Sequence, residues 1–382
     1  MHYDFAQINH IDQALKAIEG RNEFIVVDQK WFTTIRYAVV TNDTFREVNN
    51  EIEAIIHDLR GVAFDKNGKI LSRPFHKFFN LNEKSFTQTS LIDFSKEHKI
   101  ITKLDGSMVR PIFSEEFNGF RLATKAGISD VALQAEVFVA SNPHIFKLFR
   151  YCLEHGLTPI FEYVAPDNRI VVRYEKTDMV LLAIRETVSG KYFPVEETHE
   201  IAKRFNVTSV LDVEEFSLGS IDSFVDNIRS RDDIEGVVIR FIDGHMIKVK
   251  TDTYVALHGF VDATANDRRI FALISDGAID DIKAKADTYV LDKISRAEEK
   301  YSKMYSALKK LVQEKIDPHL NRDNKELGLD TSVDPVVKKL TFEAKKGKTS
   351  GEIASNLISK NVGRDINFSR FVEKFGLEKT LE

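Results

Sequence analysis

Cysteine and tryptophan are almost absent from this chain of 382 residues, which has one of each. The single Cys152 excludes an internal disulfide framework and a cysteine-based zinc finger, and it suits a reducing compartment. Neither charge sign dominates, because the chain has 54 Lys and Arg residues and 59 Asp and Glu residues. No apolar run approaches the roughly 18 residues of a membrane helix, and residues 1–5 show no signal-peptide pattern. We therefore expect a cytoplasmic protein that is not a wholly basic nucleic-acid coat.

The pattern of the sequence changes near residue 255. Before it, turn dipeptides separate short β-branched and aromatic runs, as in antiparallel hairpins. These dipeptides are Asn67-Gly68, Asn118-Gly119, Ser189-Gly190 and Asp243-Gly244. Three segments among them have helical spacing of apolar residues, namely 131–139, 145–154 and 195–205. Strands mixed with helices predict an α+β domain over residues 1–255.

Beyond residue 255 the sequence predicts helices only. Apolar residues recur there with a period of 3.6 until Asp317-Pro318, where proline would end a helix. This stripe consists of Leu291, Ile294, Tyr301, Met304, Leu308 and Leu311. A short basic stretch, Lys338 to Lys348, follows. Residues 256–382 are therefore predicted to form a helical domain.

The most informative segment is Ile101–Ser107, in which Lys103 precedes a turn-forming Asp-Gly-Ser. Considered by itself, this segment could be explained as a surface lysine beside a turn. Three other segments also place charge inside apolar, strand-like runs, where charged residues need partners or a ligand. Their charged residues are Glu162, Glu235, and Lys248 with Lys250. Four such segments in one chain are hard to explain as solvated faces.

Hairpin geometry predicts that two of these segments converge. If Asp243-Gly244 forms a two-residue loop, Ile242 pairs with His245 and Ile239 lies opposite Lys248. A longer loop would change this register, and an exposed polar face with incidental lysines is the alternative interpretation. The residues predicted to share one face are Glu235, Val237, Ile239, Lys248 and Lys250.

The ordered set Lys-x-Asp-Gly, Glu-Gly-Val-Val and Lys-x-Lys resembles that of the covalent nucleotidyltransferases, which include polynucleotide ligases and mRNA-capping enzymes. Within them, the chain is most similar to the bacteriophage RNA ligases that repair broken tRNA, the type-one RNA ligase family. The likeness covers most of residues 55–315. It extends to the segments Leu59–Val62, Ser72–Glu83, Ala165–Val171 and Ser275–Asp281.

This resemblance implies an α+β fold with two domains. An antiparallel-sheet nucleotidyltransferase domain, similar to ATP-grasp ligases, would occupy residues 1–255 as the adenylyltransferase. An all-helical C-terminal domain over 256–382 would dock RNA or tRNA. DNA ligases and capping guanylyltransferases, the alternative families, usually continue with a five-stranded β-barrel instead. A non-enzymatic RNA-binding module is the third hypothesis, although no charged motif position is lost.

The resemblance further implies an ATP-dependent RNA ligase that joins 5′-phosphate and 3′-hydroxyl ends through lysyl-AMP and RNA-adenylate. Lys103 would be the nucleophile. The implied catalytic residues are Lys103, Glu162, Glu235, Lys248 and Lys250. The implied ATP contacts are Arg60, Lys77, Lys103, Asp105, Lys125, Glu162, Lys248 and Lys250. Mg²⁺, or Mn²⁺, would be held by Asp105, Glu162 and Glu235.

The residue types suit that chemistry. A lysine amine has an ordinary pKa of about 10.4, so attack on phosphorus requires nearby cations and desolvation to favour the neutral amine. The family often has Glu after the nucleophile, where this chain has Leu104, which bears on base selectivity. The implied partner is RNA, in particular tRNA with a broken anticodon loop, after an end-healing kinase and phosphatase. We expect a monomer in the cytoplasm, or in the host cytoplasm if a phage encodes it.

Overall fold

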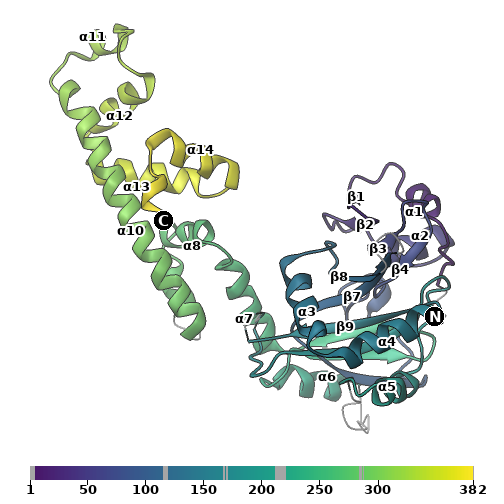
Figure 1. Cartoon of the computed structure of the whole chain (residues 1–382). Helices are drawn as coiled ribbons and strands as arrows, with labels where there is room; N and C mark the ends of the chain where they lie inside the picture. The colour runs from purple at the N-terminus through teal and green to yellow at the C-terminus, as the bar shows by residue number, and fades with distance from the viewer. Residues whose placement is uncertain are drawn as a thin grey trace. The chain divides into compact units, whose positions relative to one another are not determined.

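The computed structural model describes residues 5–114, 119–166, 168, 171–210, 221–283, 286 and 288–381. The chain forms two compact units, Met1–Val255 and Ala256–Glu382 (Figure 1). The first contains antiparallel sheets and helices, and the described part of the second contains helices alone. This confirms the predicted α+β fold with an all-helical C-terminal region. None of the helices in the described ranges is long and apolar enough to span a bilayer.

The first unit begins with a four-stranded sheet whose apolar side shares one core with two helices. Its elements are α1 (Ile11–Ala17), β1 (Phe24–Asp28), β2 (Thr33–Tyr37), α2 (Glu51–Asp58), β3 (Arg60–Phe64) and β4 (Ile70–Ser72). The strands pair in chain order, and the predicted turn Asn67-Gly68 joins β3 to β4. Because β2 pairs with β3, Arg36 lies opposite Arg60, which brings the end of β2 beside the start of β3.

The second sheet has the strand order β10-β9-β7-β8 and is covered by the three helices that the sequence predicted. Its elements are β7 (Ser107–Ser114), β8 (Gly119–Ala123), α3 (Asp130–Ala140), α4 (Pro143–Glu154), β9 (Leu157–Val164), β10 (Asp178–Glu186) and α5 (Val195–Arg204). Cys152 is buried in this core. Strands β7 and β8 pair as a hairpin, although Asn118 of the predicted turn lies outside the described residues.

The third sheet, of order β5-β12-β11-β6, positions the segments with charged residues. Its elements are β5 (Phe79–Asn80), η1 (Ser85–Thr87), η2 (Thr89–Leu91), β6 (His98–Lys103), α6 (Ile221–Ser230), β11 (Gly236–Phe241) and β12 (Met246–Lys250). Strand β11 pairs antiparallel with both β6 and β12, whereas β5 pairs parallel with β12. Lys103 at the end of β6 therefore lies one strand away from Lys250 at the end of β12.

The loop between β11 and β12 is one residue longer than predicted. The amide of Phe241 donates to the carbonyl of His245 at 2.9 Å, so the loop is Ile242-Asp243-Gly244. Gly244 has φ +85°, and a glycine in the left-handed region is typical of a three-residue loop. The resulting pairs are Gly236 with Lys250, Val237 with Val249, Val238 with Lys248, and Ile239 with Ile247.

The predicted shared face was therefore wrong for Val237 and Ile239. Both side chains lie in the apolar core with Ile247, because a slip of one residue moves every side chain of a strand to the other face. Lys248 and Lys250 instead share their face with Val238 and Arg240 of β11.

The second unit is built around one long helix, α10 (Thr288–Ile316), which carries the predicted apolar stripe and ends before Pro318. Ile294, Met304 and Leu308 of that stripe are fully buried. The other elements are α7 (Asp252–Ala263), which begins in the first unit, α8 (Asp267–Ser275), α9 (Ile279–Lys283), η4 (Asp317–His319), α11 (Asn324–Leu329), α12 (Pro335–Lys345), α13 (Ser350–Asn361), α14 (Asp365–Phe375) and η5 (Glu378–Thr380). Helices α8, α12 and α13 pack against α10.

Candidate active site

Lys103 faces a buried carboxylate that comes from the start of the neighbouring strand. Its Nζ donates a hydrogen bond to Glu235 Oε2 at 2.7 Å, and Lys250 Nζ lies 2.9 Å from Glu235 Oε1. The Glu235 side chain is 2% exposed, whereas the two lysine side chains are 25% and 24% exposed. One carboxylate thus holds two ammonium groups at the mouth of the site, and the structure brings these three predicted residues into direct contact.

Gly236 makes this contact possible. It pairs with Lys103 on one side and with Lys250 on the other, so it lies where the three strands meet. Its φ is +153°, and a Cβ built on it would lie 2.1 Å from the carbonyl oxygen of Val249. Only glycine tolerates so close a backbone approach. The Glu-Gly pair therefore lets Glu235 sit between the two lysines.

A cavity of about 320 Å³ opens beside Lys103 within the first unit. The predicted site residues that line it are Arg60, Lys77, Lys103, Glu162, Lys248 and Lys250. Apolar side chains, including Ile101, Leu104 and Val238, line the same cavity. Concave sites that combine apolar walls with a few convergent charged groups are typical of small-ligand binding. The positive groups among its walls favour an anionic ligand.

Burial changes the protonation of two groups in this cavity. Glu162 lies on β9, and burial raises the pKa of its carboxyl to about 7, against the opposing influence of Lys103. Burial also lowers the pKa of Lys248 to about 7, and the neighbouring Lys77 adds to that effect. Both groups therefore change charge near neutral pH, which is a common property of functional sites.

A cluster of cations surrounds Tyr37 at the end of β2. Lys125 Nζ lies 4.0 Å and Lys77 Nζ 5.9 Å from the centroid of its ring, and Arg60 hydrogen-bonds to its side chain. Burial alone would raise the pKa of the phenol, but Arg60, Lys125 and Lys77 outweigh it and the pKa is lowered. Three cations around one phenol form a surface suited to the oxygens of a polyphosphate.

Lys77 and Lys125 differ in their relation to the cavity. Burial lowers the pKa of Lys77, which lines the cavity. Lys125 is absent from the described residues that line it and connects to the site through Tyr37. The structure thus brings together around Tyr37 three of the residues that the resemblance implied as ATP contacts, Arg60, Lys77 and Lys125.

Asp105 has a different setting from the other predicted acidic residues. Its carboxylate is 1% exposed, and one oxygen accepts hydrogen bonds from the amides of Val171 and Val172 at 2.6 and 2.7 Å. The other oxygen accepts one from the Tyr254 hydroxyl at 2.7 Å. Protein donors therefore occupy both oxygens, and Asp105 does not line the cavity. These hydrogen bonds connect the turn after Lys103 to Val171, Val172 and Tyr254.

Two carboxylates fit the chemistry of a divalent cation better than three do. No group of three or more His, Cys, Asp or Glu side chains in the described ranges is arranged to hold a metal ion. Mg²⁺, however, is usually bound by one or two carboxylates together with substrate phosphates and water. Glu162 is a buried carboxylate in the cavity wall, and Glu235 is a second buried carboxylate, whose two oxygens contact Lys103 and Lys250. The donor set therefore fits a metal that enters with a phosphate ligand.

Two tyrosines near the site were missed by sequence reasoning. Tyr254 in α7 bonds to Asp105 and lies under Lys250, whose Nζ is 4.6 Å from its ring centroid. Burial raises the pKa of its hydroxyl, so this group remains a hydrogen-bond donor. Its position four residues after Lys250 was an available signal. No comparable signal in the sequence pointed to Tyr37, because the first 50 residues match the family pattern only loosely.

Comparisons with known proteins show the family to which the chain belongs. The sequence profile of a family described as RNA ligase matches residues 58–254, more than half of the chain. A protein of Thermovibrio ammonificans, provisionally named an RNA ligase, is 29% identical over 283 residues, which cover 72% of this chain and 71% of that protein. The RNA ligase of Rhodothermus phage RM378 is 23% identical over 321 residues, which cover 67% and 73% of the two chains.

Solved structures show weaker similarity. A variant of the Naegleria gruberi RNA ligase, solved with ATP and Mn, is 16% identical and has a TM-score of 0.36. The match covers 43% of this chain and 52% of that one, so this chain spans about half of that ligase.

Proposed function

Because this chain belongs to the RNA ligase family, we propose that it is an ATP-dependent RNA ligase that joins a 5′-phosphate to a 3′-hydroxyl end. One observation carries the proposal. Lys103, Glu162, Lys248 and Lys250 come from three different strands, β6, β9 and β12, yet line one cavity. An amine, a carboxylate and two further cations around an apolar hollow suit covalent capture of a nucleotide.

In the first step, the ammonium of Lys103 would lose one proton to solvent, and the neutral amine would then attack the α-phosphorus of ATP. A nitrogen–phosphorus bond forms, the bond to the bridging oxygen breaks, and pyrophosphate leaves. Glu235 accepts a hydrogen bond from this amine and would take its proton. Lys248 and Lys250 would stabilise the charge that develops on the α-phosphate.

The outer phosphates would lie against the cluster around Tyr37. Arg60 and Lys77 line the cavity, and Lys125 shares the same tyrosine. Glu162 and Glu235 would hold Mg²⁺ or Mn²⁺, which neutralises phosphate charge when bound. Asp105 would support the turn that carries Lys103, and its assignment as a metal ligand stays a prediction.

RNA would enter after ATP has reacted. A 5′-phosphate oxygen would attack lysyl-AMP, releasing Lys103 and forming RNA-adenylate. The 3′-hydroxyl of the second end would then attack the 5′-phosphorus and displace AMP. We propose broken tRNA as the substrate, an RNA kinase and phosphatase as the source of the matched ends, and a monomer acting in the cytoplasm of a cell or phage host.

The absence of a barrel favours this activity over the alternatives. Residues 256–382 contain helices only within the described ranges, whereas a five-stranded barrel usually follows the catalytic domain of DNA ligases and capping enzymes. The first unit would then be the adenylyltransferase, and the helical unit would contact RNA.

Incubation with each labelled nucleoside triphosphate, followed by denaturing electrophoresis, tests the proposal. We expect label on the protein from ATP, and joining of RNA ends in preference to DNA ends. Label from GTP alone would indicate a capping enzyme, and preferential joining of DNA would indicate a DNA ligase. A protein that takes label from none of the four is not a nucleotidyltransferase.

A further inference from the structure

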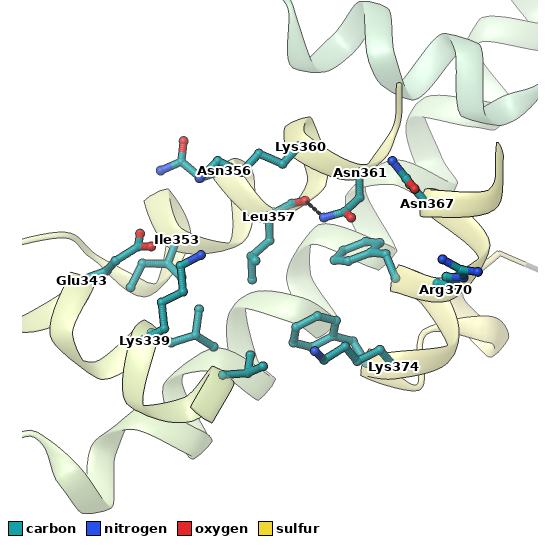
Figure 2. Close-up of a pocket in the computed structure, with 14 residues that line it drawn as sticks. Lys339, Glu343, Ile353, Asn356, Leu357, Lys360, Asn361, Asn367, Arg370 and Lys374 are labelled. Carbon is teal, nitrogen blue, oxygen red and sulfur yellow. Dashed lines mark hydrogen bonds between the residues drawn. The ribbon is translucent and has the colours of Figure 1, made fainter. Parts of the chain in front are cut away.

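The helical unit contains a basic pocket that the site around Lys103 does not explain. It lies between α12, α13 and α14 and has a volume of about 310 Å³ (Figure 2). Four cations and three amides line it. They are Lys339, Lys360, Arg370 and Lys374, and Asn356, Asn361 and Asn367.

The positive charge of this pocket is not balanced by the ion pairs that the structure describes. Glu343, which also lines the pocket, lies 2.9 Å from Lys348 outside it, and Lys348, with smaller contributions from Lys360 and Lys339, lowers the pKa of the Glu343 carboxyl. Within the described ranges, no ion pair engages any of the four pocket cations. Residues 335–382 have ten Lys and Arg against six Asp and Glu, although the whole chain has a net charge of −5. Like charges gathered on three helices are stabilised by an anion.

The floor of the pocket is apolar and includes aromatic rings. Leu340, Ile353 and Phe371 are nearly fully buried beneath it. Phe375 is half-buried, and its ring centroid lies 5.3 Å from that of Phe371. Amides and aromatic rings that line the same hollow suit a nucleobase, since unstacked bases are read by hydrogen bonding at their edges and by stacking on their faces.

The basic stretch Lys338 to Lys348 contributes little to this surface. Lys338 Nζ donates to the carbonyl of Gly328 at 3.0 Å, and Lys345 Nζ to Asn324 Oδ1 at 3.0 Å. Lys348 pairs with Glu343, whereas Lys339 lines the pocket. Three lysines of the stretch therefore bind oxygens of their own unit, and the cations that face one hollow come from three helices.

We infer that this pocket binds one unpaired nucleotide of the RNA substrate. Its phosphate lies among the four cations, and its base lies over Phe375 and against the asparagine amides. The volume of this pocket is at the lower end of the range for small-ligand pockets. Bases that are stacked within a duplex cannot enter the pocket. This inference rests on the proposed function, because it takes the RNA of the ligation reaction as the ligand.

The test compares two triple variants of the full chain with the same change in charge. The pocket variant carries Lys360→Ala, Arg370→Ala and Lys374→Ala. The control variant carries Lys346→Ala, Arg364→Ala and Lys379→Ala, three exposed cations of the same unit that do not line the pocket. Fluorescence anisotropy measures the Kd for a labelled single-stranded RNA and for a duplex of the same sequence, over a salt titration.

We expect the pocket variant to bind single-stranded RNA roughly tenfold more weakly than the wild type. The slope of log Kd against log salt falls by about 0.7, the value for the one single-strand phosphate that the pocket binds. The control variant and duplex binding change little. Equal binding by both variants, or equal weakening of single strand and duplex, overturns the inference.

Phe375→Leu separates stacking from charge. It keeps an apolar side chain in the pocket but removes the aromatic face, and we expect severalfold weaker single-strand binding with an unchanged salt slope. Unchanged affinity overturns the placement of the base. Label transfer from ATP to Lys103 is measured in every variant and should equal that of the wild type. If the wild type itself takes no label from ATP, the proposed function is refuted. If labelling is normal and the pocket variant binds RNA as the wild type does, only the inference about the pocket is refuted.

Discussion

The amine of Lys103 would be needed covalently only until AMP reaches the RNA. We therefore expect Lys103→Ala to abolish both labelling by ATP and ligation from ATP, yet still join chemically pre-adenylated RNA at a reduced rate. Labelled ATP with denaturing electrophoresis measures the first activity, and a pre-adenylated strand measures the second. Acid-labile protein-AMP in the Lys103→Ala variant would remove this residue as the nucleophile.

Glu162 links the site to the stability of the first unit. Its pKa is raised from 4.5 to about 7 by burial, so the folded protein binds more protons than the unfolded chain between these values. The free energy of unfolding must fall as pH rises through this window. The Glu162→Gln variant has no ionisable group at this position, so its free energy of unfolding does not fall for this reason. The free energy of unfolding of the variant relative to that of the wild type should therefore increase between pH 5 and pH 8 by on the order of 2 kcal/mol.

Urea unfolding followed by Trp31 fluorescence measures this difference, because the single tryptophan lies in the first unit. Glu154→Gln, at an exposed position, controls for the loss of one carboxylate. A difference between Glu162→Gln and wild type that is the same at pH 5 and pH 8 would show that Glu162 ionises as it does in the unfolded chain.

At the scale of the elements, the close approach of β11 and β12 at Gly236 determines whether the charged groups meet. Gly236→Ala would place a Cβ 2.1 Å from the carbonyl of Val249, which separates the strands or rotates Glu235 away from Lys103. We expect label transfer from ATP to fall at least tenfold, together with a lower midpoint of urea unfolding.

Gly156→Ala is the matched control. Gly156 also has a positive φ, +67°, but its Cβ would meet nothing within 4 Å, so this variant carries only the backbone cost of about 1–2 kcal/mol. Equal labelling by the two variants would mean that the close approach at Gly236 is not needed for the site.

At the scale of the whole molecule, the residues proposed for chemistry and those proposed for RNA docking belong to different units. Substituting Lys338, Lys339, Lys345, Lys346 and Lys348 together should leave lysyl-AMP formation unchanged. Joining of a nicked anticodon stem-loop should fall more than joining of a short unstructured RNA, with a weaker salt dependence. Wild-type rates with both substrates across a salt titration would show that this stretch does not dock RNA.

A second readout is needed for this variant, because three of these lysines bind oxygens of their own unit, as Lys345 does at Asn324. Circular dichroism during heating would detect a loss of helical structure. Lys339→Ala alone removes a pocket cation with no such contact in the described ranges, and it should weaken RNA joining without lowering the midpoint of unfolding.

The sequence by itself determined the features that depend on short stretches of chain. The 3.6-residue period ending at Pro318 predicted α10, and the turn dipeptides Asn67-Gly68 and Asp243-Gly244 predicted the pairings of β3 with β4 and of β11 with β12, because helices and turns follow from local spacing and backbone preference. The order of the charged motifs around Lys103, Glu235 and Lys248 identified the family. These patterns need no knowledge of which strands become neighbours.

Only the tertiary structure decided how those motifs meet. Asp243-Gly244 is compatible with loops of two or three residues, and the packing of Val237 and Ile239 into the core selects the longer one. Likewise, Asp105 and Glu162 are both carboxylates in charged motifs, but hydrogen bonds from other segments fill the oxygens of Asp105, whereas Glu162 faces the cavity. Register, burial and the basic pocket of the helical unit depend on contacts between residues far apart in the chain, which local patterns do not encode.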